Sequence, residues 1–438
     1  MPNIKDEVTA FHRGKQEVVF DFLGEDISSD GGVLLLKKVE RKTHLIRTLA
    51  TLIPDKRNPL FIKYDYQHLL EQRVFQMALG YQDCNDAKFL HDDPVMQEVL
   101  GGDLCSQPTL CRLENMMDRK TLWSISEAWV DHYVASIKPD RKKIVLDIDS
   151  TDDPAHGGQQ MVMFNGFYNQ HQLDQLLIFD GETGQLVLPV LRPGNSHTAR
   201  WAFSILKRII KKIRTRFPQM RIELRADAGF SCSELYALVG DLDLVFAVGI
   251  AANATLKGLV KDIQLEIKET YVDKGEPFKF ITDGFEYKAD SWAEPQTVYA
   301  KIESTGKGLN TRFFISNFTE MTGEEVYWDF YVCRGETCEN RIKEFKNMCF
   351  SGRLSCHSFW ANSLRLFLSG IVYEFFGELK KMIARTSHDQ AKKWQVDNIR
   401  LFLLKIGATV IRRVRKVTIR FSRAFAQQEL FRELMQAA

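Results

Sequence analysis

Three acidic residues, far apart in the sequence, have the side-chain type and the setting that metal-dependent cleavage of a phosphodiester requires. They are Asp149 within Lys143–Thr151, Asp227 within Arg225–Phe230, and Glu339 within Tyr331–Lys346. Magnesium prefers oxygen ligands, and a protein usually supplies one or two carboxylates while substrate phosphates complete the shell. Two such ions about 4 Å apart activate an attacking water and stabilise the leaving oxygen of an in-line displacement. If the three acids converge, the sequence predicts a site for two Mg²⁺ ions, with Mn²⁺ as a substitute.

The first acidic segment contains two candidate ligands. Strand alternation places Asp147 and Asp149 on the same face of the expected strand Lys143–Asp149. Asp149 closes that strand, a position from which a side chain projects outward, so we expect Asp149 to be the first ligand. Asp147 remains the competing ligand. Spacing alone also fits a solvent-facing strand edge that leads into a turn at Asp152–Pro154.

The other two acids are also ambiguous when each is taken alone. Asp227 precedes Ala228–Gly229, small residues that let a backbone approach a polyanion closely, but it would equally suit a turn that caps the next helix. On a helical wheel, Glu339 lies at the margin of an apolar face. Its neighbour four residues later, Lys343, offers the alternative of a surface ion pair worth a few tenths of a kcal/mol.

The order of the expected elements gives the reason to expect convergence. β-Branched runs, turn residues and a long apolar stripe predict strand, strand, strand, helix, strand, in that order. These elements are Lys143–Asp149, Leu176–Asp180, Gln185–Leu191, a helix capped by Ser196 that runs to Phe217, and Arg221–Ala226. An RNase H-like fold uses this order, and its first and fourth strands are neighbours. That adjacency would bring Asp149 and Asp227 together.

The fold class expected for the whole chain is α/β, with an RNase H-like core interrupted by an insertion. We expect five regions: a mainly helical N-terminal domain (1–138), the first part of the core (139–250), a β-rich insertion (251–328), the second part of the core (329–378) and a basic helical C-terminal region (379–438). A chain of 438 residues is long enough for several structural units.

Charge is distributed unevenly along the chain. The formal net charge is only +2, but Leu379–Phe425 contains thirteen Lys and Arg against two Asp, a local charge of +11. Local fields govern the encounter with a polyanion more than the total charge does, so this segment indicates DNA binding. A solvated basic helix face is the plainer alternative.

The cysteines and the hydropathy pattern indicate a reducing, non-membrane setting. None of the eight cysteines forms a CxxC pair, which argues against a zinc site and favours buried thiols. No apolar run approaches the roughly 18 residues that span a bilayer, and the start of the sequence carries no secretory pattern. We therefore expect a cytoplasmic, nucleoid-associated protein without a membrane partner.

The third acidic segment resembles that of bacterial insertion-sequence DDE transposases, in the cut-and-paste branch marked by a Tyr-Arg-Glu-Lys signature. The matching residues are Tyr331, Arg334, Glu339 and Lys346, with one extra residue between Arg334 and Glu339. The segments around Asp149 and Asp227 are similar to the family's first two acidic motifs. The resemblance covers about residues 60 to 430.

This resemblance implies an enzyme that cleaves terminal inverted repeats and joins the freed 3′-hydroxyl ends to target DNA. Asp149, Asp227 and Glu339 would be catalytic metal ligands, and double-stranded DNA the substrate. Arg334 and Lys346 would hold phosphates, and Tyr331 would pack against a sugar or base. Trp292 is a candidate for holding a flipped base, with a buried structural role as the alternative. The N-terminal domain and the basic tail would bind transposon ends, and two copies would pair in the synaptic complex.

Two other functions fit parts of the sequence. Asp147-Ile-Asp149-Ser-Thr151 also matches the pattern of a haloacid-dehalogenase-type phosphatase, in which Asp147 would be the nucleophile. The hairpin after this strand and the poor match at Gly240-Asp241 argue against that function. A catalytically inactive or domesticated transposase that binds DNA without cutting it is the second alternative.

Overall fold

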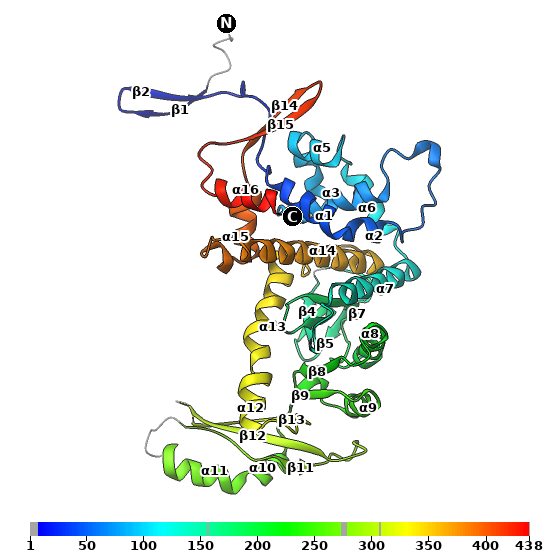
Figure 1. Cartoon of the computed structure of the whole chain (residues 1–438), viewed down its shortest axis with the longest axis vertical. Helices are drawn as coiled ribbons and strands as arrows, with labels where there is room; N and C mark the ends of the chain where they lie inside the picture. The colour runs from blue at the N-terminus through cyan, green and yellow to red at the C-terminus, as the bar shows by residue number, and fades with distance from the viewer. Residues whose placement is uncertain (1–7, 156, 273–277, 306–307, 438) are drawn as a thin grey trace.

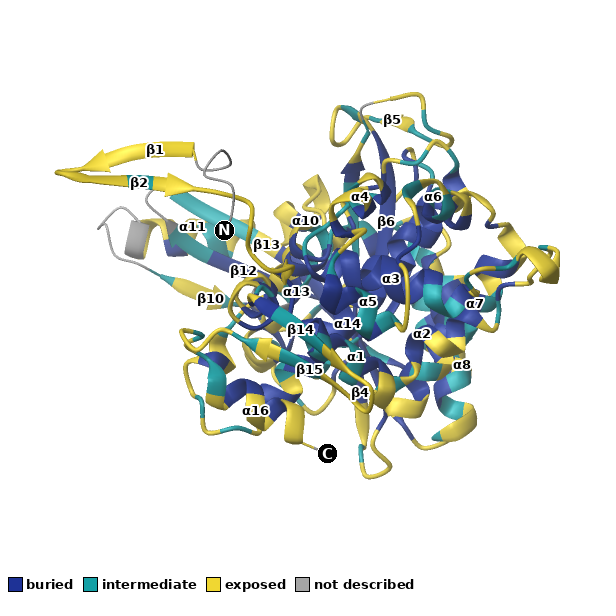
Figure 2. Ribbon diagram, turned by 90° about the horizontal axis from the view of Figure 1, so that it is seen from above, coloured by how far each residue is buried: buried dark blue, intermediate teal, exposed yellow. Residues whose placement is uncertain are grey.

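The computed structural model describes residues 8–155, 157–272, 278–305 and 308–437 of the chain. In Figure 1, helices from both ends of the sequence form the upper part of an elongated molecule, and a large sheet forms the lower part. Figure 2 shows that buried residues concentrate in the helical part and the sheet, whereas the N-terminal hairpin is exposed. Among the described helices, none is both long and apolar enough to cross a bilayer.

The N-terminal region begins with strands and continues as helices. Val8–Arg13 (β1) and Gln16–Phe20 (β2) form an antiparallel hairpin at the start of a region that was expected to be mainly helical. The rest of the region comprises β3 (Ile27–Ser28), α1 (Val33–Thr43), α2 (Leu45–Ala50), α3 (Tyr66–Ala78), α4 (Ala87–Leu90), α5 (Pro94–Leu100), α6 (Gln107–Asn115) and α7 (Arg119–Ser136). Asp65, Asp93 and Asp118 cap α3, α5 and α7 by accepting backbone N–H groups, which explains where these helices start.

Ten described strands form one sheet in the order β10-β12-β13-β9-β8-β4-β6-β5, with β11 paired to β12 and β7 paired to β6. Their bounds are β4 (Lys143–Pro154), β5 (Met163–Asn165), β6 (Gln170–Asp180), β7 (Leu186–Arg192), β8 (Arg221–Ala226), β9 (Val245–Ile250), β10 (Lys279–Ile281), β11 (Phe285–Tyr287), β12 (Gln296–Thr305) and β13 (Gly308–Ser316). β4 and β8 are parallel neighbours, as the element order predicted, and Ile148 pairs with Ala226. β4 is longer than expected, because its outer part continues to pair with β6 as far as Pro154.

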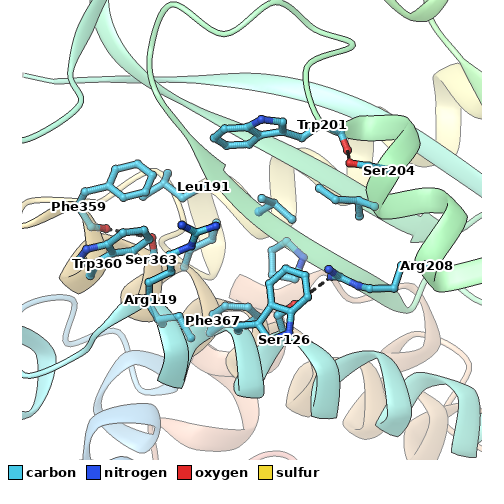
Figure 3. Close-up of a pocket in the computed structure, with 16 residues that line it drawn as sticks. Arg119, Ser126, Leu191, Trp201, Ser204, Arg208, Phe359, Trp360, Ser363 and Phe367 are labelled. Atoms are coloured by element: carbon cyan, nitrogen blue, oxygen red, sulfur yellow. Dashed lines mark hydrogen bonds between the residues drawn. The ribbon is translucent and has the colours of Figure 1, made fainter. Parts of the chain in front are cut away.

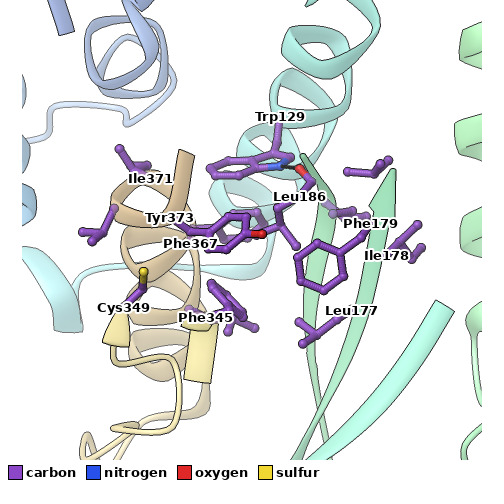
Figure 4. Packing of buried hydrophobic residues seen from close by; sticks show 14 of the residues in the cluster. Trp129, Leu177, Ile178, Phe179, Leu186, Phe345, Cys349, Phe367, Ile371 and Tyr373 are labelled. Carbon is purple, nitrogen blue, oxygen red and sulfur yellow. Dashed lines mark hydrogen bonds between the residues drawn. The ribbon is translucent and has the colours of Figure 1, made fainter. Parts of the chain in front are cut away.

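The helices α7, α8 (Ala202–Arg216) and α14 (Phe359–Ala384) surround the sheet near β7 (Figure 1). In Figure 4, Trp129 of α7 donates a hydrogen bond to the Leu186 carbonyl of β7 at 3.0 Å, and its ring lies 5.8 Å from that of Phe367 on α14. These contacts join three elements into one buried core. The expected helix cap at Ser196 was wrong, since α8 starts only at Ala202 and Trp201 occupies the cap position.

The expected β-rich insertion (251–328) differs from the structure in two respects. Its first part is helical, with α10 (Ala254–Leu259), α11 (Lys261–Ile267) and a π-helical segment (Lys268–Val272), because Asn253 caps a run without strand alternation. Its long β12–β13 hairpin extends the central sheet, since Ile315 of β13 pairs with Val248 of β9. The aromatic and β-branched run Phe313–Ile315 suits this buried pairing.

The C-terminal region was expected to be helical, and this was wrong for its most basic part. It comprises α15 (Val396–Ile399), a π-helical segment (Arg400–Leu404), β14 (Ala408–Arg413), β15 (Lys416–Phe421) and α16 (Gln428–Gln436). Two β-branched runs, Thr409–Ile411 and Val417–Ile419, flank a short turn and therefore form a hairpin. Ala408 of β14 pairs with Ser28 of β3, so the two ends of the chain join in one sheet.

Candidate active site

Asp149 and Asp227 lie side by side because the two strands that carry them are parallel neighbours. The last parallel pair is Ile148 with Ala226, and each aspartate is the residue that directly follows one member of this pair along the chain. Asp227 starts a tight turn, in which its Oδ1 accepts the Gly229 N–H at 2.9 Å. Asp149 Oδ1 accepts the Ser150 N–H at 2.8 Å. Backbone contacts thus orient both carboxylates at one place in the sheet.

A single arginine from a distant helix faces these aspartates. Arg334 lies on α13 (Cys333–Lys343), the helix that runs from the lower sheet towards α14 in Figure 1. Its Nη2 donates to Asp149 Oδ2 at 2.7 Å, while its Nε is buried without a hydrogen-bond partner in the described chain. Burial alone would lower the pKa of Arg334, but the nearby Asp149 and Asp227 raise it overall. The guanidinium therefore stays charged and partly unsatisfied.

The three acids share one electrostatic environment. Burial raises the pKa of Asp149 to about 6; Arg334 opposes this rise, and the charges of Asp227 and Glu339 add to it. Glu339 is exposed, and none of the described residues forms an ion pair with it, Lys343 included. Within the part of the chain that the structure describes, no three acidic, His or Cys side chains lie in metal-holding geometry. Asp149 and Asp227 lie next to each other, whereas Glu339 lies at the edge of this pair.

The extra residue between Arg334 and Glu339 explains the position of the third acid. Five residues along an α-helix turn the side-chain direction by about 140°, so Arg334 and Glu339 point different ways. Cys338 is placed towards the aspartates instead: its thiol is buried, and burial followed by the charges of Asp149 and Asp147 raises its pKa to about 12. π-Helical segments flank α13 on both sides, at Val326–Tyr331 and Glu344–Met348. Such segments accommodate one extra residue per turn.

Asp147, the competing first ligand, is inaccessible to solvent in the structure. Its side chain is fully buried, and Arg225 on β8 contacts it twice, through Nε at 2.6 Å and Nη2 at 2.9 Å. Arg341 of α13 adds a third contact at 3.4 Å. A phosphatase nucleophile must be reached by its substrate, so this geometry also speaks against Asp147 as a phosphorylated residue. The sequence reasoning missed both arginines, although Arg225 stands two residues before Asp227 just as Asp147 stands two before Asp149.

The remaining members of the third motif are held by the protein itself. Lys346 Nζ lies 2.9 Å from Asp152 Oδ1 and 3.3 Å from Thr151 Oγ1, on the outer part of β4. The Tyr331 ring stacks on Phe314 at 5.8 Å, and burial raises the pKa of its hydroxyl. Lys346 therefore lines the strand that carries Asp149, and Tyr331 packs beneath the site.

Two expectations about contact with DNA meet a different arrangement. Trp292 is only 7% exposed and makes edge contacts with Tyr236 at 4.8 Å and Tyr287 at 5.4 Å. This geometry suits the structural alternative for Trp292 better than a ring that holds a base. Gly229 is small because Thr198 packs against it, since a Cβ there would lie 2.9 Å from the Thr198 side chain.

In the basic C-terminal segment, some positive charges are buried or paired inside the protein, and others are exposed. Arg400 is buried and donates to the Ala78 carbonyl at 2.8 Å, and Lys380 pairs with Glu344 at 2.6 Å. By contrast, the hairpin β14–β15 carries four exposed cations that form no ion pair with any described residue: Arg413, Arg415, Lys416 and Arg420. These four exposed cations therefore lie on a hairpin rather than on a helix face.

A family model described as Transposase DDE domain group 1 matches residues 11–438. Among solved structures, the chain is similar to a piggyBac transposase in a cryo-EM synaptic complex with hairpin DNA, with 12% identity, a TM-score of 0.43, and coverage of 86% of this chain and 80% of that chain. It is also similar to the NurA nuclease from Sulfolobus solfataricus, with 11% identity, a TM-score of 0.22, and coverage of 66% of this chain and 100% of that chain. No curated protein matched the sequence.

Proposed function

The chain belongs to group 1 of the transposase DDE domains, and from this membership we propose that it cleaves the terminal inverted repeats of an insertion sequence and joins the freed 3′-hydroxyl ends to target DNA. The observation that carries the proposal is the pairing of β4 with β8, which sets Asp149 beside Asp227. The pKa of Asp149 also responds to Asp227 and to Glu339. We assign these three acids as the catalytic residues.

The strand order supports an RNase H-like core for this site. Five strands run β7-β6-β4-β8-β9, with β6 antiparallel to β4 and with β8 and β9 parallel to their neighbours. Numbered along the chain this is the order 3-2-1-4-5, in which the first and fourth strands are adjacent. In this proposal the β12–β13 hairpin is an insertion that continues the core sheet before α13 returns to the site.

The donor set fits a hard divalent cation, and we take two Mg²⁺ ions as the cofactor, with Mn²⁺ as a substitute. Asp149 and Asp227 supply carboxylate oxygens of the type Mg²⁺ prefers. Burial in the first place, and the charges of Asp227 and Glu339 in addition, keep the pKa of Asp149 at about 6 in spite of Arg334, so a bound cation would stabilise its charged form. Bound there, the ions supply an activated water and stabilise the leaving oxygen. Glu339 completes the set once α13 turns it towards the aspartates, a change that the flanking π-helical segments accommodate.

The other residues of the site act on the DNA. Arg334 contacts Asp149, and the Lys346 ammonium contacts Thr151 and Asp152, so both cations lie along the outer part of β4, where they would hold backbone phosphates. The half-buried Tyr331 would pack against a sugar or base. The exposed cations of β14–β15 would provide a second positive surface for the double-stranded transposon end. Two copies of the chain would act together in the synaptic complex.

A magnesium-dependent cleavage assay on a duplex that carries the element's own end tests this function. Asp227→Asn should retain DNA binding and lose cleavage, because the amide keeps the turn at Gly229 but removes a ligand charge. Chelation of divalent cations should abolish cleavage by the unaltered chain, and added Mg²⁺ or Mn²⁺ should restore it. Cleavage by Asp227→Asn at the normal rate would refute the assignment.

One observation favours a second candidate, a transposase that binds DNA without cutting it. The position that faces the aspartates on α13 is occupied by Cys338, while Glu339 is exposed. If α13 never turns, the chain would bind transposon ends and leave them intact. The same assay separates the two functions, because only the active enzyme nicks the bound duplex.

A further inference from the structure

The N-terminal hairpin and the segment that follows it form an arm, Val8–Asp26, with an uncovered apolar surface. Every residue of the arm is exposed except Val18, which is half-buried. Its large apolar side chains include Phe11 at 60%, Phe20 at 48% and Phe22 at 92% exposure. A two-stranded hairpin is marginally stable alone in water, and uncovered apolar surface of this kind marks an interaction site. The arm therefore needs a partner surface.

The second half of the arm is acidic. From Gln16 to Asp26 it contains four carboxylates, Glu17, Asp21, Glu25 and Asp26, and no Lys or Arg, whereas the first half carries Arg13 and Lys15 next to the turn of the hairpin. Such a segment repels the phosphates of DNA. Its partner surface must therefore combine apolar side chains with positive charge.

A cavity of about 710 Å³ elsewhere on the molecule has this combination. It opens between α7, β7, α8 and α14, and its walls include Trp123, Trp201, Trp360 and Phe359 (Figure 3). The three tryptophans are 54%, 46% and 37% exposed. Trp201 also holds a left-handed backbone at φ 63°, which costs a bulky residue energy and directs its ring over the opening. Cavities of this size, lined by aromatic rings, are typical binding sites.

The charge around this cavity is positive. None of the residues that line it is Asp or Glu, and Arg119 forms part of its wall. The Arg200 guanidinium lies 4.8 Å from the centre of the Trp201 ring. Neither Arg119 nor Arg200 takes part in an ion pair with the described residues, whereas Arg208 is paired with Glu127 at 2.8 Å. Two unpaired cations thus stand at the edge of an aromatic cavity.

We infer that this cavity receives the arm of a second copy of the chain. Phe20, Phe22 and neighbouring apolar residues enter between the tryptophans, and the arm's carboxylates pair with Arg119 and Arg200. In Figure 1 the arm leaves the molecule at the upper left, whereas α7 and α8 lie on the right-hand side, so the two surfaces are apart within one copy. A two-fold dimer makes the contact twice, and each copy then covers the other's arm. The inference rests on the homodimer of the proposed function and names its surfaces.

Charge reversal on each side of the contact tests this inference in the full chain. The arm variant is Asp21→Lys with Glu25→Lys, and the cavity variant is Arg119→Glu with Arg200→Glu. Sedimentation over a concentration series, with and without duplex DNA, should show self-association of the unaltered chain. Each variant alone should weaken association by at least about tenfold, because like charges then meet at both contacts. An equimolar mixture should restore it, since both contacts of the mixed dimer are again complementary.

The altered side chains are exposed, so each variant should keep the circular dichroism and thermal unfolding of the unaltered chain. A chain that stays monomeric with and without DNA would overturn the inference, as would a mixture that fails to restore association. Loss of single-stranded oligonucleotide binding by the cavity variant, with normal association of both variants, would assign the cavity to nucleotides instead. Asp227→Asn should associate normally, so failure of cleavage and failure of association are separate results.

Discussion

Asp147 and Asp149 stand two residues apart on one face of β4, and each pairs with an arginine. The surroundings of these two carboxylates differ. Asp147 is fully buried and has two arginine partners, Arg225 from the adjacent strand and Arg341 from α13. Asp149 keeps 15% of its side chain exposed and has Arg334 as its one arginine, beside two further acids. The inner carboxylate is fully compensated by two arginines and holds β4 to β8, whereas the three outer acids face one arginine and keep an excess of negative charge. That imbalance distinguishes a reactive position from a structural one.

The largest expected effect is a loss of cleavage activity on substitution of Asp149, which distinguishes this carboxylate from Asp147. Asp149→Asn should reduce cleavage by on the order of a thousandfold, because a charged group that acts on the reacting phosphate is lost. DNA affinity should change only a few-fold, since the amide keeps its contact with Arg334. Cleavage and binding assays on the same end duplex measure both quantities. Undiminished cleavage would move the first ligand elsewhere.

The free energy of unfolding should distinguish the two aspartates in the opposite sense, with the loss at Asp147. Asp147→Ala should lower the free energy of unfolding by about 3–5 kcal/mol, because Arg225 is left buried without its counter-charge. Urea denaturation measures this loss. The double variant Asp147→Ala with Arg225→Met should recover part of it, as the uncompensated charge is removed. A loss below about 1 kcal/mol would mean that the inner pair does not fasten the sheet.

The pH dependence of stability sharpens the comparison further. The pKa of folded Asp149 is about 6, above its ordinary value of 3.8, so the unaltered chain loses stability as pH rises from about 4 to 6. Asp149→Asn should escape that loss and be more stable at pH 8 by up to about 3 kcal/mol, since one pKa unit corresponds to about 1.4 kcal/mol. Near pH 4 the two chains should unfold alike. Urea titrations at several pH values test this, and an equal difference at every pH would contradict it.

The smallest expected effect concerns the outer end of β4. Lys346→Ala should weaken binding of the end duplex several-fold and reduce the slope of log affinity against log salt by about 1, as expected for one lost phosphate contact. Lys343→Ala is the matched control, because Lys343 is exposed at the end of α13, three residues before Lys346, and forms no ion pair with a described residue. Equal salt slopes for the two variants would show that Lys346 serves only Asp152 and Thr151.

Local patterns predicted most elements that carry the site. A β-branched run located β4, the order of elements placed a strand at β8, and together they put Asp149 and Asp227 on neighbouring strands. The same local reasoning failed for strands whose pairing partners lie far away in the sequence. The β12–β13 hairpin joined the core sheet through β9, and the basic C-terminal hairpin joined β3 at the other end of the chain. Such partners lie far apart in sequence, so no local periodicity reveals them.

The direction of each side chain along β4 is a local property of an extended backbone, and the sequence therefore determined that Asp147 and Asp149 share a face. It also determined that Glu339 follows Arg334 by five positions on α13, and with this spacing the offset between the two side chains. Only the tertiary structure decided which aspartate is fully buried, Asp147, and which stays partly exposed, Asp149. Their partners Arg225, Arg334 and Arg341 lie 78, 185 and 194 residues away from them, and packing alone brings these charges to one place.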